Sequence, residues 1–482
     1  MNTERFLHPF SPQGRYPIGG GNEGQSAPRK LEGGSNELYT REFKLPSEVE
    51  ASLSKNQRKI LLSLVRAARR FGQLYTEYDD KSDPRLPFYP LGVKKERILD
   101  AAKSNPEIIS PYTIVSRSEN GVLVATPMHK FYQDKLKTLG ILDLLKRAAD
   151  AAGRGKDKDI KLQRYLKAKA KAFENGDYEG AERIWLERED EPIIDIAIGF
   201  YDTYSDRFLG IKYSAEAWVG VLDRQLTSDT QWFSDSFLKW WQQTTRRSAP
   251  RAKMRIEHTR IQSGQAARYE WSGNSLPCQS GWRAAMGSKF TIFKPVFVDK
   301  FLHQKLPNLR DLIDTRKIQG ITDSFVKLAT LRTHIAHEIG HSLVPSENIQ
   351  QRLQKHAAWL KELYCDLLAL TGYRRVKGLN LRESEIALAM LLSEGYLEYQ
   401  NQRKRPEYHK KSTILLNYLL EEGSIRVEEG HFTWEDTEAV FKGIASLLKE
   451  VQKMLEEGKF SDVQQLHDKY FDPTIYRHFL MK

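Results

Sequence analysis

The segment His337-Glu338-Ile339-Gly340-His341 constrains the fold more than any other, and it lies in a stretch of helical apolar periodicity. Residues four apart share one face of an α-helix, so both imidazoles can meet one zinc ion while Glu338 reaches a water molecule. A catalytic zinc takes three protein ligands and keeps one position open. The chain must therefore bring a further ligand from another element to this helix. The alternative is two ordinary helix histidines.

The next predicted helix, which Ser346 can cap, runs through WLKELYCDLLAL (359–370) and supplies that ligand. Glu362 and Asp366 share one face of it, four residues apart. We predict Glu362 as the third zinc ligand. Asp366 is expected to accept the free N–H of a ligand imidazole and so fix its tautomer; the alternative is two solvent-facing acids. His334 is interpreted as a packing residue, as a support of the ligands or as a competing ligand.

Composition narrows the class of protein. Of 482 residues, 40% are apolar and 29% charged, as is typical of a soluble globular chain with a large core and room for two lobes. The cysteines, Cys278 and Cys365, are too few for a disulfide scaffold or a zinc finger, so a metal must use histidine and carboxylate ligands. The net charge of +12 comes without zinc-finger spacing or an aromatic-rich RNA signature, so nucleic acid is not an expected partner.

The sequence also indicates where the chain resides. No window reaches the roughly 18 uninterrupted apolar residues of a membrane-spanning helix. The first 40 residues lack the apolar core of a secretory signal. We therefore expect a cytoplasmic chain without a membrane partner. Nothing in the sequence indicates its oligomeric state.

Local patterns predict several elements of the first 300 residues. Ser54 and Gln57 have capping-box spacing before a long amphipathic helix, and Asn120-Gly121 lies between two strand-like runs. Residues 154–172 are rich in lysine and arginine, which favours a solvated helix face over an anion-binding patch. Residues 192–204 alternate like a half-buried strand whose polar face carries Asp195.

After Thr322 the periodicity is almost entirely helical. We predict an α+β fold that is mainly α: a flexible leader (1–36), a mixed α/β lobe with substrate-cleft strands (37–300) and a mainly helical zinc-binding lobe (301–482).

Several blocks resemble the dipeptidyl peptidase III family of zinc metallopeptidases. HEIGH followed by ELYCDLLAL is similar to its zinc motifs, in the five-residue form of the bacterial branch. The similarity extends in order over residues 38–471, through LSKNQRKILLSLVRAARRFGQLY, FYPLGV, PYTIVSRSENGVLVATP, PIIDIAIGFYDTYSDRFLGIKYSAEAWVGV, NSLP before KFTIFKPV, LLNYLLEEGSI and LLKEVQKMLEEGKFSDVQQLHDKY.

The resemblance implies the architecture of a two-lobed metallopeptidase with a cleft between the lobes, with zinc ligands at His337, His341 and Glu362 and a general base at Glu338. It also implies that Asp195 holds the free amino terminus of a peptide; the alternative is that Asp195 pairs with a neighbouring lysine or caps a turn.

The chain departs from the family in its substrate-side blocks. Cys278 follows Pro277 where the family has an asparagine, which leaves Asn274 and Ser275 as the amine-binding candidates. The family's transition-state histidine falls at Tyr408, with His409 beside it, so either residue is a candidate for stabilising the oxyanion.

We therefore predict a zinc peptidase with one zinc ion per chain that hydrolyses short peptides and releases dipeptides from a free amino terminus. The interval of 20 residues between His341 and Glu362 is close to that of thermolysin-like peptidases. An aminopeptidase or endopeptidase of that kind is thus an alternative. A zinc-stabilised binding protein without hydrolytic activity is another.

Overall fold

A computed structural model describes residues 39–77, 83–188, 193–345, 349–403 and 406–480. The predicted leader, 1–36, and the predicted cap, Ser346, lie outside these residues. The described residues divide into two compact units. An α/β unit contains the described part of Gly34–Trp232 together with Pro250–Asp299, and a helical unit contains Phe233–Ala249 together with the described residues from Lys300 onward.

The α/β unit is built on a mixed sheet. Its elements are β1 (Thr40–Glu42), α1 (Ser47–Ser52), α2 (Lys55–Gly72), α3 (Lys95–Ser104), β2 (Thr113–Arg117), β3 (Leu123–Pro127), α4 (Met128–Phe131), α5 (Gln133–Thr138), α6 (Ile141–Ala152), α7 (Ile160–Asn175), α8 (Tyr178–Leu186), β4 (Ile194–Tyr201), β5 (Ser214–Leu222), β6 (Ala252–Gly264), α10 (Gln265–Arg268), β7 (Gly273–Leu276), α11 (Ser280–Met286), β8 (Ser288–Phe293) and α12 (Lys294–Lys300). Within the described residues the main sheet has the order β4-β5-β6-β8-β7, and β1 pairs with the end of β6. Only the β6–β8 pairing is parallel among these strands.

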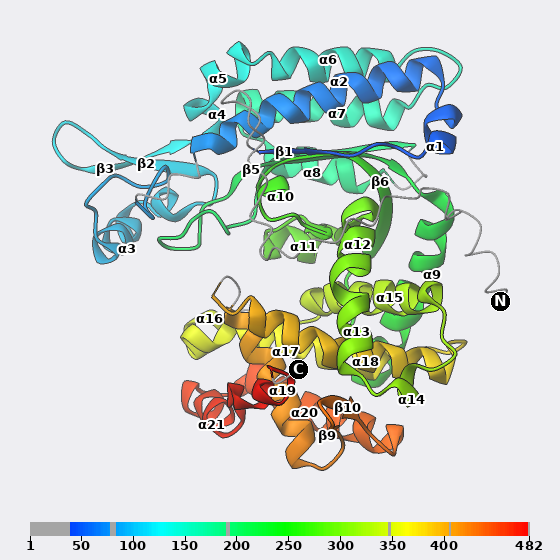
Figure 1. Cartoon of the computed structure of the whole chain (residues 1–482). Helices are drawn as coiled ribbons and strands as arrows, with labels where there is room; N and C mark the ends of the chain where they lie inside the picture. The colour runs from blue at the N-terminus through cyan, green and yellow to red at the C-terminus, as the bar shows by residue number, and fades with distance from the viewer. Residues whose placement is uncertain (1–38, 78–82, 189–192, 346–348, 404–405, 481–482) are drawn as a thin grey trace. The chain divides into compact units, whose positions relative to one another are not determined.

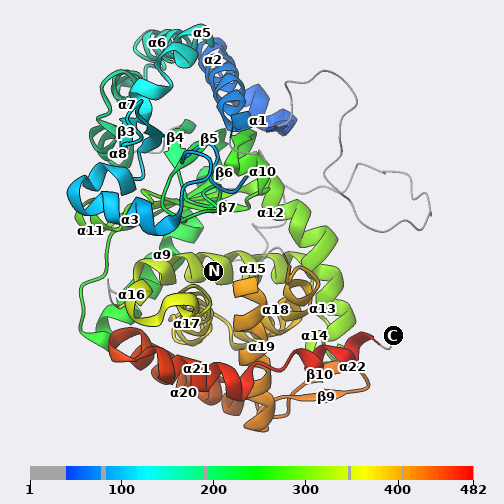
Figure 2. The ribbon, with the colours of Figure 1, turned by 90° about the vertical axis from the view of Figure 1, so that its left-hand side faces the viewer.

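Helices cover one face of this sheet. The side chain of Ser54 accepts a hydrogen bond from the Gln57 amide and that of Gln57 accepts one from the Ser54 amide, which confirms the predicted capping box of α2. The apolar stripe of α2 is buried against β5 and β6. Figures 1 and 2 show α2 and α6 side by side on this face. The predicted hairpin at Asn120-Gly121 is confirmed as β2 and β3, with Ile114 opposite Thr126.

The strand β4 differs from its prediction. Alternation predicts one buried and one solvated face, but all eight residues of β4 are buried. The polar face with Asp195 is therefore a second buried face. Lys169 is a similar exception in the basic segment 154–172, because it lies in α7 with 1% exposure and pairs with Glu182. Both charges are buried because ionic partners are buried with them.

The helical unit confirms the mainly helical prediction. Its elements are the second half of α9 (Arg224–Thr245), a π-helical turn (Phe301–Lys305), α13 (Leu306–Leu312), α14 (Thr315–Ile318), α15 (Asp323–Ser342), α16 (Ile349–Leu353), α17 (Ala357–Tyr373), α18 (Leu381–Gln400), α19 (Pro406–Glu421), β9 (Arg426–Glu428), β10 (His431–Thr433), α20 (Thr437–Glu457), α21 (Phe460–Tyr470) and α22 (Arg477–Leu480). The sequence analysis did not anticipate the short hairpin of β9 and β10.

The helix α17 is the centre of this unit. It packs against α15, α18, α19 and α20, and most of its circumference is buried. A helix that is apolar all round belongs in the interior, which agrees with the sequence of WLKELYCDLLAL. Any acid carried by α17 is consequently placed among its neighbouring helices.

The second half of α9 belongs to the helical unit, although it precedes residue 300. Phe233 and Phe237 are fully buried there, and the ring of Phe233 lies 5.4 Å from that of Tyr373 in α17. These aromatic contacts explain why a segment that the sequence analysis placed in the α/β lobe groups with the helices. Among the described helices, none has the length and apolar character needed to cross a bilayer.

Candidate active site

The helix α15 positions two of the predicted zinc ligands. Thr322 caps its first turn by accepting a hydrogen bond from the Phe325 amide. Ile335 and Ile339 are fully buried and fix the rotation of the helix. The same rotation places His337 and His341 on a face directed toward α17, where each is partly exposed.

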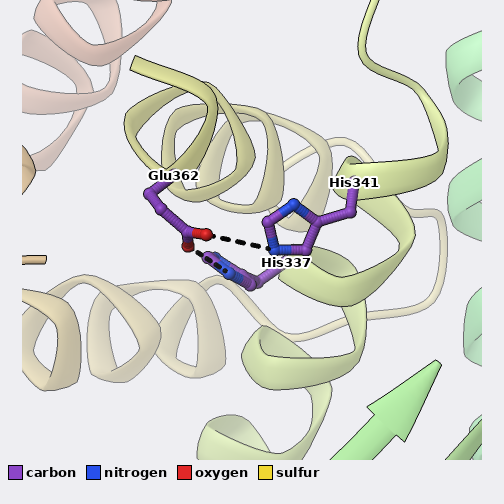
Figure 3. Close-up of side chains that lie close together, drawn as sticks. All are labelled: His337, His341 and Glu362. Atoms are coloured by element: carbon purple, nitrogen blue, oxygen red, sulfur yellow. Dashed lines mark ion pairs between the residues drawn. The ribbon is translucent and has the colours of Figure 1, made fainter. Parts of the chain in front are cut away.

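His337, His341 and Glu362 converge on one point. One ligand atom from each lies within 4.8 Å of the other two. The Nε2 atom of His337 is 3.2 Å from Glu362 Oε2, and that of His341 is 3.7 Å from Glu362 Oε1. Figure 3 shows the carboxylate of Glu362 reaching from α17 toward both imidazoles on α15.

These donors fit a zinc ion. Tetrahedral zinc with bonds of about 2.0–2.1 Å holds its ligand atoms about 3.3 Å apart. The imidazole Nε2 atoms of His337 and His341 lie at similar distances, 3.2 and 3.7 Å, from the Glu362 oxygens. Two imidazoles and one carboxylate are a ligand set of hydrolytic zinc enzymes, and three protein ligands leave one position open. The site can therefore hold a catalytic metal rather than a closed structural one.

The charges around the histidines also favour a cation. Burial alone would lower the pKa of His337, but Asp366 and Glu362 raise it to about 10. Burial would raise the pKa of Glu362, but His341 and His337 hold it at about 2. The acids thus favour a positive charge at His337, and a divalent cation would take the place of its proton.

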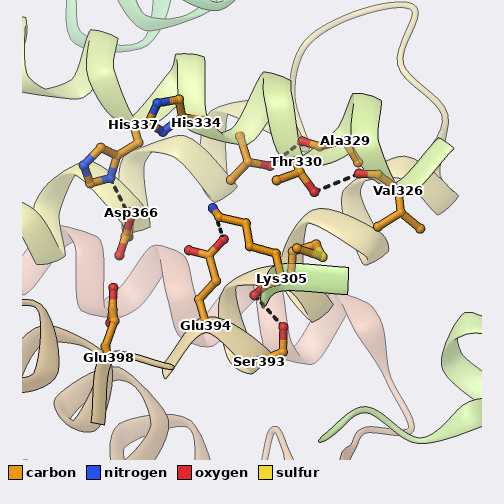
Figure 4. A network of polar contacts seen from close by, with 12 residues as sticks. Lys305, Val326, Ala329, Thr330, His334, His337, Asp366, Ser393, Glu394 and Glu398 are labelled. Carbon is orange, nitrogen blue, oxygen red and sulfur yellow. Dashed lines mark hydrogen bonds and ion pairs between the residues drawn. The ribbon is translucent and has the colours of Figure 1, made fainter. Parts of the chain in front are cut away.

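Asp366 occupies the position predicted for the residue that fixes a tautomer. The Nδ1 atom of His337 lies 2.6 Å from Asp366 Oδ1, and Figure 4 shows this contact. When Nδ1–H donates to the carboxylate, Nε2 is left free to bind metal. The imidazole of His341 has a different neighbour, the thiol of Cys365, whose sulfur lies 3.3 Å from its Nδ1.

Glu338 lies beside the metal-binding group on the same helix. Its side chain is 22% exposed and its Oε1 is 4.0 Å from Nε2 of His334. His334 does not belong to the group of converging ligand atoms. Its contact with Glu338 places it next to the predicted general base.

Asp195 is not placed as the resemblance implies. It is 1% exposed, and its Oδ1 accepts hydrogen bonds from Arg188 at 2.8 Å and from the indole of Trp185 at 3.1 Å. Burial would raise its pKa, but Lys289 and Arg188 lower it. This is the alternative of an ion pair with a neighbouring base, so we do not assign Asp195 to substrate binding.

Two acids that were not predicted from the sequence contact Asn274. The Nδ2 atom of Asn274 donates to Glu216 Oε1 at 2.9 Å and to Asp202 Oδ2 at 3.4 Å. Burial, together with Asp202 next to it, raises the pKa of Glu216, and burial raises that of Asp202. Asp202 is partly exposed and has a positive φ of 50°, a conformation that costs energy in a residue with a side chain.

Two further sequence features lie beside this acid cluster. Asp202 begins the Asp-x-Tyr segment that directly follows β4, in the same sequence block as Asp195. Ser275, the other predicted amine-binding residue, follows Asn274 in β7, and its Oγ is buried without a hydrogen-bond partner among the described residues. Successive residues of a strand point to opposite faces, so the hydroxyl of Ser275 does not face the acids that Asn274 contacts.

The two oxyanion candidates have different surroundings. His409 is 4% exposed and packs against the rings of Tyr399, Phe471 and Tyr476, which is a core position. Tyr408 is partly exposed, and its ring lies 5.2 Å from Nζ of Lys411. The burial of His409 makes Tyr408 the better placed of the two for contact with a substrate.

No family model matches the chain. The chain is 23% identical to Nudix hydrolase 3 of Arabidopsis thaliana over 371 residues, which are 73% of this chain and 46% of that protein. It thus spans about half the length of this curated relative, whose name does not by itself assign an activity to the matched part.

Two solved structures are similar to nearly all of the chain. DPP III from Caldithrix abyssi has a TM-score of 0.76 and 19% identity, with 92% of this chain and 95% of that one covered. Dipeptidyl-peptidase III from Corallococcus sp. strain EGB has a TM-score of 0.76 and 18% identity, with 91% and 93% covered. The chain therefore has the α+β, mainly helical fold of the dipeptidyl peptidase III structures.

Proposed function

We propose that the chain is a zinc-dependent peptidase of the dipeptidyl peptidase III family that releases dipeptides from short peptides with a free amino terminus. The observation that carries the proposal is the convergence of His337, His341 and Glu362 on one point beside Glu338. The fold shared with two dipeptidyl peptidase III structures supports it.

Zinc in such a site supplies a Lewis acid that polarises a carbonyl group and acidifies water. Glu338 takes a proton from the attacking water and returns it to the leaving amine. His334 lies beside this carboxylate, with Nε2 4.0 Å from Glu338 Oε1. Asp366 holds His337 with Nε2 directed at the other ligands.

We assign amine recognition to the acid cluster of Asp202, Glu216 and Asn274 in place of Asp195. A peptide ammonium donates hydrogen bonds, and the accessible acceptor here is Asp202, which is partly exposed. A cation next to two acids also relieves the repulsion between them. Recognition of a free amino terminus is what distinguishes dipeptide release from endopeptidase cleavage.

The test is a digest of a peptide library by purified zinc-loaded protein, read by mass spectrometry. Dipeptides are the expected products, whereas single amino acids would indicate an aminopeptidase and internal fragments an endopeptidase. Glu338→Gln should keep zinc and lose about 10²- to 10⁴-fold in rate, the usual value of a general base. If the wild type binds zinc but hydrolyses no peptide, the remaining interpretation is a zinc-stabilised binding protein.

A further inference from the structure

Behind the predicted zinc ligands lies a buried lysine that the sequence analysis did not single out. Lys411 of α19 has a side chain that is 3% exposed, and it forms an ion pair with Asp366 Oδ2. Its Nζ is also 3.3 Å from Oε1 of Glu398, on α18. Three helices thus bring an acid, a base and an acid together in the interior.

The two oxygens of Asp366 have separate partners. Oδ1 faces Nδ1 of His337, and Oδ2 faces Lys411. A carboxylate can rotate about its terminal bond, so a single hydrogen bond from an imidazole does not determine its orientation. Because Lys411 engages the second oxygen, it fixes the first one against His337.

Glu398 in turn holds the lysine. Its Oε1 contacts Lys411 and its Oε2 accepts a hydrogen bond from Ser412, the next residue along α19. Figure 4 shows Asp366 and Glu398 beneath His337, with the pair of Lys305 and Glu394 beside them. Lys305 has its own partner, Glu394, which leaves Lys411 as the lysine that contacts Asp366 among the described ion pairs.

A role in stability alone would not require a lysine at residue 411. Replacing a buried ion pair by apolar residues is often neutral or stabilising, so burial of the pair is weak grounds for a stability role. The ion pair of Lys411 with Asp366 matters instead because Asp366 also holds the imidazole of His337. Partners of a ligating histidine set its tautomer and orientation, and their loss typically costs metal affinity.

We propose that Lys411 is a positioning residue of the zinc site, which holds Asp366 in the orientation that directs Nε2 of His337 at the metal. The inference rests on the proposed zinc binding and deepens it. It extends the residues on which metal affinity depends from α15 and α17 to α19, and it predicts an effect on binding in the absence of any substrate.

The experiment measures the zinc dissociation constant by competition with a chromophoric chelator, without substrate. Lys411→Met and Asp366→Asn should each weaken zinc binding by about 10- to 100-fold. The double variant should bind no more weakly than Asp366→Asn alone, because the lysine acts through the aspartate. The visible spectrum of the cobalt-substituted protein should change in Lys411→Met, since the orientation of a ligand changes.

Two controls separate this role from folding. Lys169→Met removes a lysine that is equally buried and paired with Glu182, in the other unit, and should leave zinc affinity unchanged. If Lys411→Met does not fold, Lys411→Met combined with Glu398→Gln removes both charges and should show the same loss of affinity.

Wild-type zinc affinity in folded Lys411→Met, or losses that multiply in the double variant, would overturn the inference. A wild-type protein that binds no zinc would overturn the proposed function as well, so the two failures can be told apart.

Discussion

Gly340 of α15 lies directly against Cys365 of α17. A Cβ atom on Gly340 would be 3.1 Å from the Cα of Cys365 and 3.2 Å from its sulfur. The two helices therefore approach at the position where one carries His341 and the other carries Glu362. The absence of a side chain at residue 340 allows His337, His341 and Glu362, from two helices, to converge on one point.

Replacing Gly340 with alanine should push α15 and α17 apart. Overpacking of this kind costs about 1–3 kcal/mol in the free energy of unfolding, and the displacement should also weaken zinc binding. Urea unfolding and zinc titration measure the two effects. Gly443→Ala is the matched control, because this helical glycine faces only the ends of the Leu419 and Ser424 side chains. Equal stability of the two variants would contradict the role of the close approach.

Removal of any one metal ligand should empty the site. His337→Ala, His341→Ala and Glu362→Ala should each lose most of the bound zinc, because two ligands hold the ion far less well than three. Metal content by mass spectrometry after dialysis gives the stoichiometry, expected at about one per chain in the wild type. His129→Ala removes a histidine of the α/β unit and should keep its zinc. Full zinc content in all three ligand variants would refute the assignment.

The metal-free protein should lose stability as pH rises. The pKa of His337 is about 10 in the folded protein and 6.5 in the reference state. The stabilisation from its proton is complete below about pH 6.5 and is lost as pH approaches 10, because the folded state binds the proton more tightly. The slope from this group is about 1.4 kcal/mol per pH unit between these limits.

The measurement is the difference in free energy of unfolding between metal-free wild type and His337→Gln, followed by urea titration at several pH values. Taking the difference cancels the pH dependence that comes from groups that do not contact His337, such as Lys289, whose pKa burial lowers to about 7. The difference should be largest near pH 6 and shrink above about pH 6.5; at more acidic pH it also changes with the two acids that contact His337, Glu362 and Asp366. A difference that does not vary with pH would mean that His337 is not held protonated by its acidic neighbours.

Asp202, rather than Asp195, should recognise a free amino terminus. Acetylating the peptide removes the ammonium, and a hydrogen bond to a charged group is worth about 1.5–3 kcal/mol. The wild type should therefore lose about 10- to 150-fold in kcat/KM on acetylation. Asp202→Asn should cleave both peptides at similar, reduced rates.

Asp195→Asn provides the comparison between the two acids. It leaves the buried Arg188 with a weaker partner, so it should lower the melting temperature while preserving the discrimination against acetylated peptides. If acetylation affects Asp202→Asn as strongly as it affects the wild type, the acid cluster does not bind the amine.

Structural features that depend only on residues close together in the sequence were predicted correctly. The capping box of α2 depends on Ser54 and Gln57 alone, and the hairpin of β2 and β3 depends on the short loop that carries Asn120-Gly121. The shared face of His337 and His341 follows from helical spacing in the same way. Each of these features needs no knowledge of the rest of the chain.

Features that depend on packing between distant segments were not predictable in this way. Asp195 and Asp202 lie in one sequence block, but their surroundings differ. Asp195 is buried in β4 and paired with Arg188, whereas Asp202 is partly exposed. Lys411 is 45 residues from Asp366, and no spacing rule connects them. The hairpin of β9 and β10 has strands of three residues, too short for an alternating pattern to be recognised.

The second half of α9 has a consequence for how the chain is made. Phe233 and Phe237 leave the ribosome roughly 140 residues before Tyr373, which at a synthesis rate of about 5–20 residues per second is a delay of about 7–28 s. During that interval the aromatic face of α9 lacks Tyr373, against which Phe233 packs in the folded protein. This exposed aromatic face is a binding site for a chaperone of nascent chains. A fragment that begins at residue 301 would lack Phe233 and Phe237, which are buried in the helical unit.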